Sequence, residues 1–90
     1  MVSEILTVTN RAGFHMRLAG AFVSAMNDFP CAVTLLHKGR EIDGKSIMSV
    51  MAACMQQGAE IEIQCAGPDE DAALKIAVAL IRSGGESENE

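Results

Sequence analysis

The sequence predicts an α+β fold, an open-faced β-sandwich in which three helices cover one face of a four-stranded antiparallel sheet. Segments of alternating hydrophobicity and segments of helical spacing follow one another in the order strand, helix, strand, strand, helix, strand, helix. The connections are short, which suits antiparallel pairing. The length of 90 residues is enough for one domain with a single modest core.

The first predicted strand and helix enclose a polar loop. Residues 4–9 alternate, with Leu6 and Val8 on one face, and predict a strand. Residues 16–27 predict a helix, and Pro30 cannot extend it. The apolar face expected to pack on the sheet comprises Leu18, Ala19, Phe22, Ala25 and Met26.

A β-hairpin is predicted next. Residues 31–36 form a strand with Val33 and Leu35 pointing inward, and residues 40–43 return as a short strand. The dipeptide Lys38-Gly39 is typical of a tight turn, in which glycine supplies the positive φ.

The remaining elements are a short helix, a strand and a final helix. Ser46 is a good N-cap for a helix over 47–53, whose Ile47, Val50 and Ala53 are expected to face inward. Residues 59–66 alternate regularly, with Ile61, Ile63 and Cys65 on the inner face. Asp69 is a candidate N-cap for a helix that runs to about Arg82, and its expected core positions are Ala73, Ala77, Leu80 and Ile81. The domain is expected to span 1–85, followed by an acidic disordered tail over 86–90.

Composition excludes several classes of protein. The net charge of −5 argues against a nucleic-acid binder that neutralises phosphates. The N-terminus does not resemble a signal peptide, and no apolar run approaches the ~20 residues that a membrane-spanning helix needs. Cys31, Cys54 and Cys65 are odd in number and widely spaced, so we expect buried thiols in a reducing, cytoplasmic setting.

The stretch from residue 12 to residue 21 is the main candidate site. His15 comes directly after a polar loop and just before the first helix, with Arg17 two residues later. Free N–H groups and the positive end of the helix dipole make a helix start receptive to phosphate. A histidine there can act as a nucleophile toward phosphorus, although these residues alone favour the simpler interpretation, a helix cap or a surface side chain.

Residues 39–46 match the pattern G-x-x-x-x-G-K-S of a nucleotide-binding P-loop. The hairpin assignment of Gly39 and the strand assignment of Ile42 oppose this interpretation. The chain is also short for the parallel sheet of such enzymes. A P-loop protein is therefore kept only as a distant alternative.

No other catalytic or metal-binding pattern is evident in the sequence. His15 and His37 lack the spacing of a metal site, and we expect His37 to be exposed beside the hairpin turn. A nucleophile triad finds no support either. The sulphur-rich positions Met48, Met51, Cys54 and Met55 are core candidates by default, but a short helix cannot bury all of them. Together with Ile47, they predict an exposed apolar surface of adaptable side chains.

Taken together, three blocks resemble HPr, the family of histidine-containing phosphocarriers of the bacterial phosphoenolpyruvate:sugar phosphotransferase system. The resemblance covers residues 2–83 without a gap. The blocks are Gly13-Phe14-His15-Met16-Arg17, then Lys45-Ser46-Ile47-Met48-Ser49-Val50-Met51, and finally Gly58-Ala59-Glu60-Ile61 with Gly67, Asp69-Glu70 and Ala73-Leu74.

The resemblance implies a role for each block. His15 would accept a phosphoryl group on a ring nitrogen from enzyme I and pass it to a IIA domain, with Arg17 as the charge partner. Ser46 would be a regulatory site for an HPr kinase/phosphorylase. Partner binding would fall to Met16, Gly20, Ile47, Met48 and Met51. The implied protein is a monomer without cofactor or metal and not itself an enzyme, and transcriptional regulators are a further class of partner.

The sequence departs from the family pattern H-x-R-P at Leu18, where proline is expected. Leucine keeps the backbone N–H that proline lacks, so the anion-binding turn retains this donor but is less rigid. Met16 and Cys54 are also unusual, because small residues are common at both positions.

The leading hypothesis is a phosphocarrier for sugar uptake. The first alternative keeps the fold but assigns a regulatory HPr-like protein that signals phosphorylation state without sugar transport.

Overall fold

The computed structural model describes residues 1–84 and confirms the predicted order of elements. The elements are β1 (Val2–Thr7), α1 (Met16–Met26), β2 (Ala32–His37), β3 (Arg40–Asp43), α2 (Ile47–Ala52), β4 (Glu60–Ala66) and α3 (Glu70–Ser83). The largest shift from the predicted boundaries is at β1, which lies two residues earlier in the chain. The predicted tail over 86–90 lies outside the described residues.

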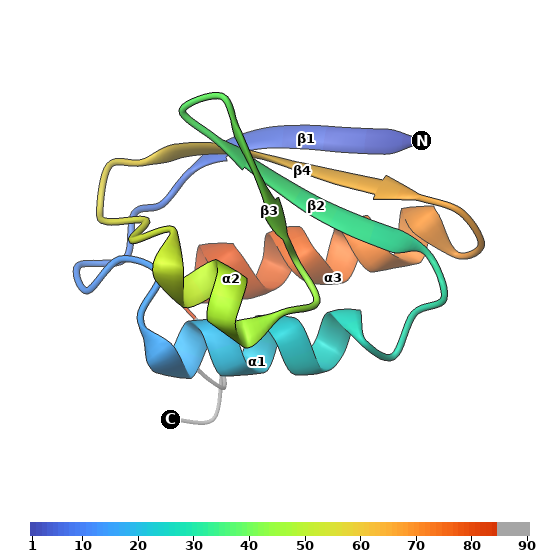
Figure 1. The fold of residues 1–90 in the computed structure, drawn as a ribbon, viewed down its shortest axis with the longest axis horizontal. Coiled ribbons are helices and arrows are strands. Elements are labelled where there is room, and N and C mark those ends of the chain that lie inside the picture. The colour runs from blue at the N-terminus through green and yellow to red at the C-terminus, as the bar shows by residue number, and fades with distance from the viewer. Residues whose placement is uncertain (85–90) are drawn as a thin grey trace.

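The four strands form one antiparallel sheet in the order β1-β4-β2-β3. Figure 1 shows all three helices on the same side of this sheet, with α1 and α3 next to each other and α2 near α1 and β3. The predicted open-faced sandwich is confirmed. No helix within residues 1–84 is long and apolar enough to cross a membrane.

The core lies between the sheet and the helices, as the alternation and helical spacing predict. The inward positions of β2 and β4 are buried, and so are Leu18, Phe22 and Met26 of α1. Phe14 packs edge-on against Phe22 with a centroid distance of 5.6 Å. In α3 the predicted Ala73, Ala77 and Ile81 are buried and Leu80 is partly buried against the core, but the prediction missed the buried Val78.

The β2–β3 hairpin closes through Lys38 and Gly39, which both have positive φ (53° and 78°). This pair matches a type I′ turn, the preferred two-residue hairpin turn. Ile42 is buried within β3, which is hydrogen-bonded along β2. Because residues 40–43 form a strand, the P-loop interpretation of 39–46 is wrong.

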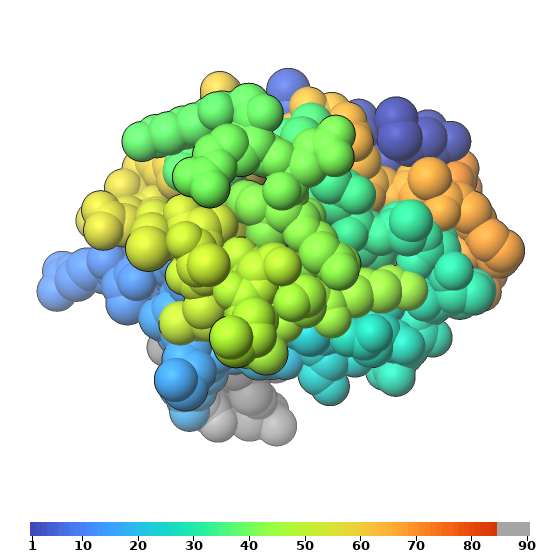
Figure 2. Space-filling model, viewed as in Figure 1, coloured from blue at the N-terminus to red at the C-terminus, as the bar shows by residue number. Residues whose placement is uncertain are grey.

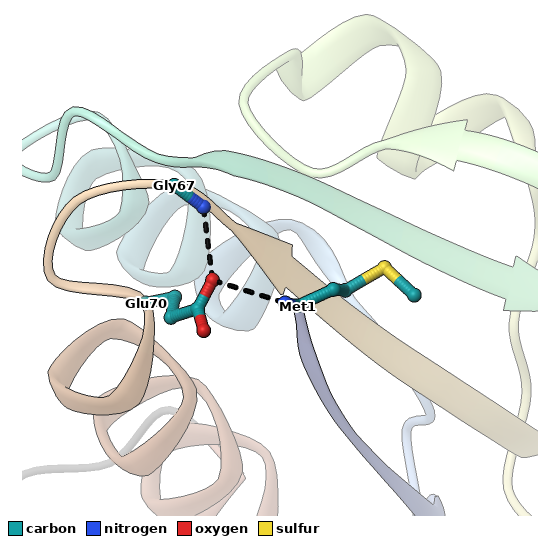
Figure 3. Close-up of polar contacts among 3 residues, drawn as sticks. All are labelled: Met1, Gly67 and Glu70. Carbon is teal, nitrogen blue, oxygen red and sulfur yellow. Dashed lines mark hydrogen bonds and ion pairs between the residues drawn. The ribbon is translucent and has the colours of Figure 1, made fainter.

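The start of α3 differs from the prediction. Asp69 precedes the helix in a left-handed conformation (φ 62°), and its side chain makes no capping hydrogen bond. The neighbouring Glu70 instead accepts a hydrogen bond of 3.0 Å from the Gly67 N–H, and the same oxygen lies 3.4 Å from the amino group of Met1 (Figure 3). Glu70 thus joins the β4–α3 turn to the first residue of the chain.

The three cysteines do not share one environment. Cys31 and Cys65 are buried as predicted, and burial raises the pKa of the Cys65 thiol to about 11. Cys54 is exposed, so the prediction for it was wrong. It lies beyond the end of α2 in a left-handed conformation (φ 53°), which turns its side chain away from the core.

Candidate functional site

His15 is the N-cap of α1. Its backbone is extended (φ −76°, ψ 176°), and its carbonyl oxygen accepts a hydrogen bond from Ala19. The ring nitrogen Nδ1 accepts hydrogen bonds from the backbone N–H groups of Arg17 (3.1 Å) and Leu18 (3.3 Å). In a neutral ring this pattern assigns the proton to Nε2 and leaves the Nδ1 lone pair directed at the helix start.

The helix start is favourable for an anion. The first turn of α1 contains no acidic residue, so the free N–H groups and the helix dipole are not neutralised locally. Leu18 has a fully buried side chain, which anchors its N–H beside the imidazole. Arg17 is exposed, and neither ion pair formed within residues 1–84 includes it. Its guanidinium is therefore available to an anion at the helix start.

The loop before His15 is fixed against the segment that follows α2. The Phe14 N–H donates a 2.7 Å hydrogen bond to the Met55 carbonyl oxygen, and Asn10 Nδ2 donates to the Gly13 carbonyl oxygen at 2.7 Å. A Cβ at Gly13 would lie 2.7 Å from the Gln56 Cα, so only glycine fits there. Sequence reasoning missed the supporting roles of Asn10 and Met55. The spacing of Asn10 and Gly13 suggests a turn, but nothing in the sequence identifies its distant partner.

The predicted partner-binding residues lie on two neighbouring helices, Met16 and Gly20 on α1 and Ile47, Met48 and Met51 on α2, and are here called the methionine patch. The side chains of Met16 and Met48 are 72% and 78% exposed. The beginning of α1 and the helix α2 lie next to each other on the face that Figure 2 shows. Met16, the first residue of α1, directly follows His15 in the chain, so one end of the patch adjoins this residue.

The structure corrects the expected inner face of α2. Val50 is buried, but Ile47 is 39% exposed and Ala53 is only partly buried. Because α2 has only six residues, one inward side chain and the following Met55 suffice to attach it to the core. Met48 and Met51 remain outside, as expected of a helix too short to bury them all.

Ser46 is the N-cap of α2, as predicted. Its Oγ accepts a hydrogen bond of 3.2 Å from the Ser49 N–H, and its own side chain is partly exposed. The preceding Lys45 is held by two hydrogen bonds. Its Nζ donates to the Phe29 carbonyl oxygen at 2.6 Å, and its carbonyl oxygen accepts a hydrogen bond from Asn27 Nδ2. These contacts connect the start of α2 to the end of α1.

His37 is not part of this site. It lies at the end of β2, is only partly exposed rather than exposed, and has Nδ1 3.5 Å from the Glu60 carbonyl oxygen. Across the described part of the chain, no cluster of three His, Cys, Asp or Glu residues could hold a metal ion.

Comparisons with known proteins agree on one family. The family described as "PTS HPr component phosphorylation site" matches residues 2–83. Phosphocarrier protein HPr of Xylella fastidiosa (strain Temecula1) is 41% identical, covering 92% of this chain and 93% of the relative, and that of Treponema pallidum is 39% identical, covering 98% and 100%. The crystal structure of HPr-C-His from Thermoanaerobacter tengcongensis has a TM-score of 0.90 at 30% identity, covering 97% of this chain and 99% of that one.

Proposed function

Because this chain belongs to the HPr family of phosphocarriers of the phosphotransferase system, we propose that His15 carries the phosphoryl group and that Nδ1 is the nucleophile. The observation that carries this proposal is the pair of N–H groups, from Arg17 and Leu18, that meet Nδ1 at the start of α1. A phosphoryl group bonded to Nδ1 would place its oxygens among these donors and beside the helix dipole.

The transfer is a displacement at phosphorus. The Nδ1 lone pair attacks the phosphoryl group of phosphorylated enzyme I, the new P–N bond forms, and the bond to the donor breaks. The backbone N–H groups of Arg17 and Leu18 then donate to phosphoryl oxygens instead of to Nδ1. The guanidinium of Arg17 stabilises the added negative charge through charge-assisted hydrogen bonds. The reverse displacement passes the group to a IIA domain.

The methionine patch is the proposed docking surface for enzyme I and IIA domains. Its exposed Met16 directly follows His15 in the chain, so a partner seated on the patch would bring its own reactive group near the imidazole. Methionine side chains can adapt to more than one partner surface, which suits a carrier with a donor and an acceptor.

Ser46 is the proposed regulatory site, modified by an HPr kinase/phosphorylase. It caps the helix that bears three residues of the methionine patch. A phosphate there adds about −1.5 to −2 charges at neutral pH, which a helix N-terminus tolerates but an apolar interface must desolvate. Modification would therefore weaken docking while leaving the fold intact.

Phosphorylation by enzyme I and phosphoenolpyruvate tests the assignment of His15. We expect intact-mass spectrometry to detect one acid-labile phosphate that disappears in His15→Ala and persists in His37→Ala, the matched control. A phosphate that persists in His15→Ala would contradict the proposal. Onward transfer to a purified IIA domain would support the carrier role, whereas a phosphorylated chain that transfers to no IIA domain would favour the regulatory alternative.

A further inference from the structure

A cleft that the proposed function does not use lies between the β2–β3 hairpin and α2. Its volume is about 420 Å³. The hairpin contributes His37, Lys38 and Arg40 to its lining, and Cys54 lies at the end nearest α2. Figure 2 shows the hairpin overhanging α2 on this face. A neighbouring hollow of about 250 Å³ is also lined by His37, Lys38 and Cys54, so the thiol borders both spaces.

The cleft is locally basic in an acidic protein. Two of the seven lysine and arginine residues and one of the two histidines line it, whereas the chain as a whole has a net charge of −5. Among residues 1–84, Glu41 is the one carboxylate in its lining. The ion pairs within residues 1–84 join Met1 to Glu70 and Arg82 to Glu4, so they do not neutralise Lys38 or Arg40. A small anion would therefore be attracted to this cleft.

The cleft also presents the one exposed thiol of the chain's three cysteines. Cys31 and Cys65 are buried in the core, and the raised pKa of Cys65 keeps that thiol protonated. Cys54 is exposed, and its left-handed backbone holds the side chain outside the core. A nucleophilic sulphur and a basic lining thus share one cavity. The floor beside them is apolar, formed by Ile42, Ala52 and Ala53.

We propose that this cleft accepts a small acidic disulfide and that Cys54 exchanges with it to form a mixed disulfide. The thiolate of Cys54 attacks one sulphur of the disulfide, a new S–S bond forms, and the old S–S bond breaks. The other half leaves as a thiolate and takes up a proton, so the incoming disulfide is the oxidant. Carboxylates on the bound half pair with Lys38 and Arg40, while its chain covers the apolar floor.

The basic lining predicts a charge preference that an exposed thiol alone would not have. We expect oxidised glutathione, which is acidic, to modify Cys54 about fivefold faster than cystamine, a cationic disulfide, at low salt. Both rates are expressed relative to those of a free cysteine peptide, which removes the intrinsic difference between the reagents. The preference should decline at high salt because the lining charges are screened.

Intact-mass spectrometry of the full chain with each disulfide provides the test. One adduct is expected, absent in Cys54→Ser, and the charge preference should disappear in the double variant Lys38→Gln/Arg40→Gln. Lys75→Gln, on α3 away from the cleft, serves as the matched control and should keep the preference. Equal relative rates for the two disulfides, or a preference that survives in the double variant, would overturn the proposal. Because His15 is not involved, this result is independent of the proposed phosphoryl transfer.

Discussion

Nδ1 of His15 lies 3.3 Å from the backbone nitrogen of Leu18, whose side chain is fully buried in the core. One residue therefore supplies both a hydrogen-bond donor to the site and an anchor for the helix that bears it. Proline, the residue that the family pattern places here, has no such donor. The chain thus keeps an additional N–H at the proposed phosphate site.

Replacing Leu18 separates these two contributions. Leu18→Pro removes the donor and the buried leucine, whereas Leu18→Ala removes the packing alone. We expect Leu18→Pro to change the rate of phosphoryl transfer from enzyme I by about tenfold or less relative to Leu18→Ala, roughly 1.4 kcal/mol of barrier. Both variants should lose stability, by about 2–4 kcal/mol for Leu18→Ala. An inactive parent chain that gains activity in Leu18→Pro would instead favour the regulatory alternative.

Arg17→Ala should slow phosphoryl transfer more than Leu18→Pro does, by more than about tenfold, because it removes a charge-assisted contact to the phosphoryl group. Since the Arg17 side chain is exposed, the thermal midpoint should hardly change. Arg11→Ala, an exposed position in the loop that precedes His15, is the control for general loss of positive charge. Equal effects of the two substitutions would show that Arg17 has no specific role.

Substitution by alanine should have opposite effects on stability at two glycines near the site. Gly13 has φ 69°, and its added Cβ would meet backbone atoms at 2.7–2.8 Å, so Gly13→Ala should lose at least about 2 kcal/mol of stability and slow phosphorylation of His15. Gly20 lies within α1 with no atom near its Cβ position, so Gly20→Ala should gain about 0.5–1 kcal/mol. Denaturant unfolding measures both values. If Gly20→Ala also slows transfer, Gly20 is a contact residue of the docking surface.

Phosphorylation of Ser46 should maintain or raise the stability of the fold but weaken the docking of partner proteins. The added charge is favourable at the start of α2, so the thermal midpoint should be kept or raised, but the same charge beside the methionine patch should slow phosphorylation of His15. Genuinely phosphorylated protein is compared with Ser46→Asp, a partial mimic. Ser46→Ala, which loses the cap, should cost about 0.5–2 kcal/mol without blocking transfer. A lowered midpoint or an undiminished rate in the phosphoprotein would contradict this account.

The Glu70 contacts predict a pH-dependent contribution to stability. The hydrogen bond from the Gly67 N–H, assisted by the amino group of Met1, holds the pKa of Glu70 below its ordinary value of 4.5. A carboxyl group with a lowered pKa in the folded state stabilises the fold above its unfolded pKa. This contribution is lost as the pH falls through the folded pKa. The thermal midpoint of Glu70→Gln should therefore lie below that of the parent at neutral pH, and the gap should close well below pH 4.5. Glu60→Gln is the exposed control, for which no such convergence is expected.

Local patterns predicted most of the fold and the position of His15, because alternation and helical spacing report directly on burial. Local patterns gave wrong predictions where contacts between distant segments decide which side chains are exposed and which polar groups pair. The length and orientation of α2 expose Ile47, and no residue within that helix indicates which of its apolar side chains face outward. Cys54 is exposed beyond the end of α2, where its backbone is left-handed. Likewise, Asp69 has a left-handed backbone, and its side chain makes no capping hydrogen bond. The Glu70 carboxylate accepts a hydrogen bond from the Gly67 N–H instead. The attachment of the His15 loop to Met55 joins segments that are remote in sequence, and local patterns do not report such pairs.

The pairing of β1 with β4 has a consequence for how the protein is made. Among the described elements β1 is synthesised first, and its partner lies in residues 60–65, with Val2 opposite Cys65 and Thr7 opposite Glu60. The loop that holds His15 in turn needs Met55. Contacts between such distant segments form only after a long loop has closed. A partly synthesised chain that ends before β4 contains both His15 and Met55 but lacks the strand that lies between β1 and β2. The sheet is therefore completed only when the last of its four strands enters between two that have already been made.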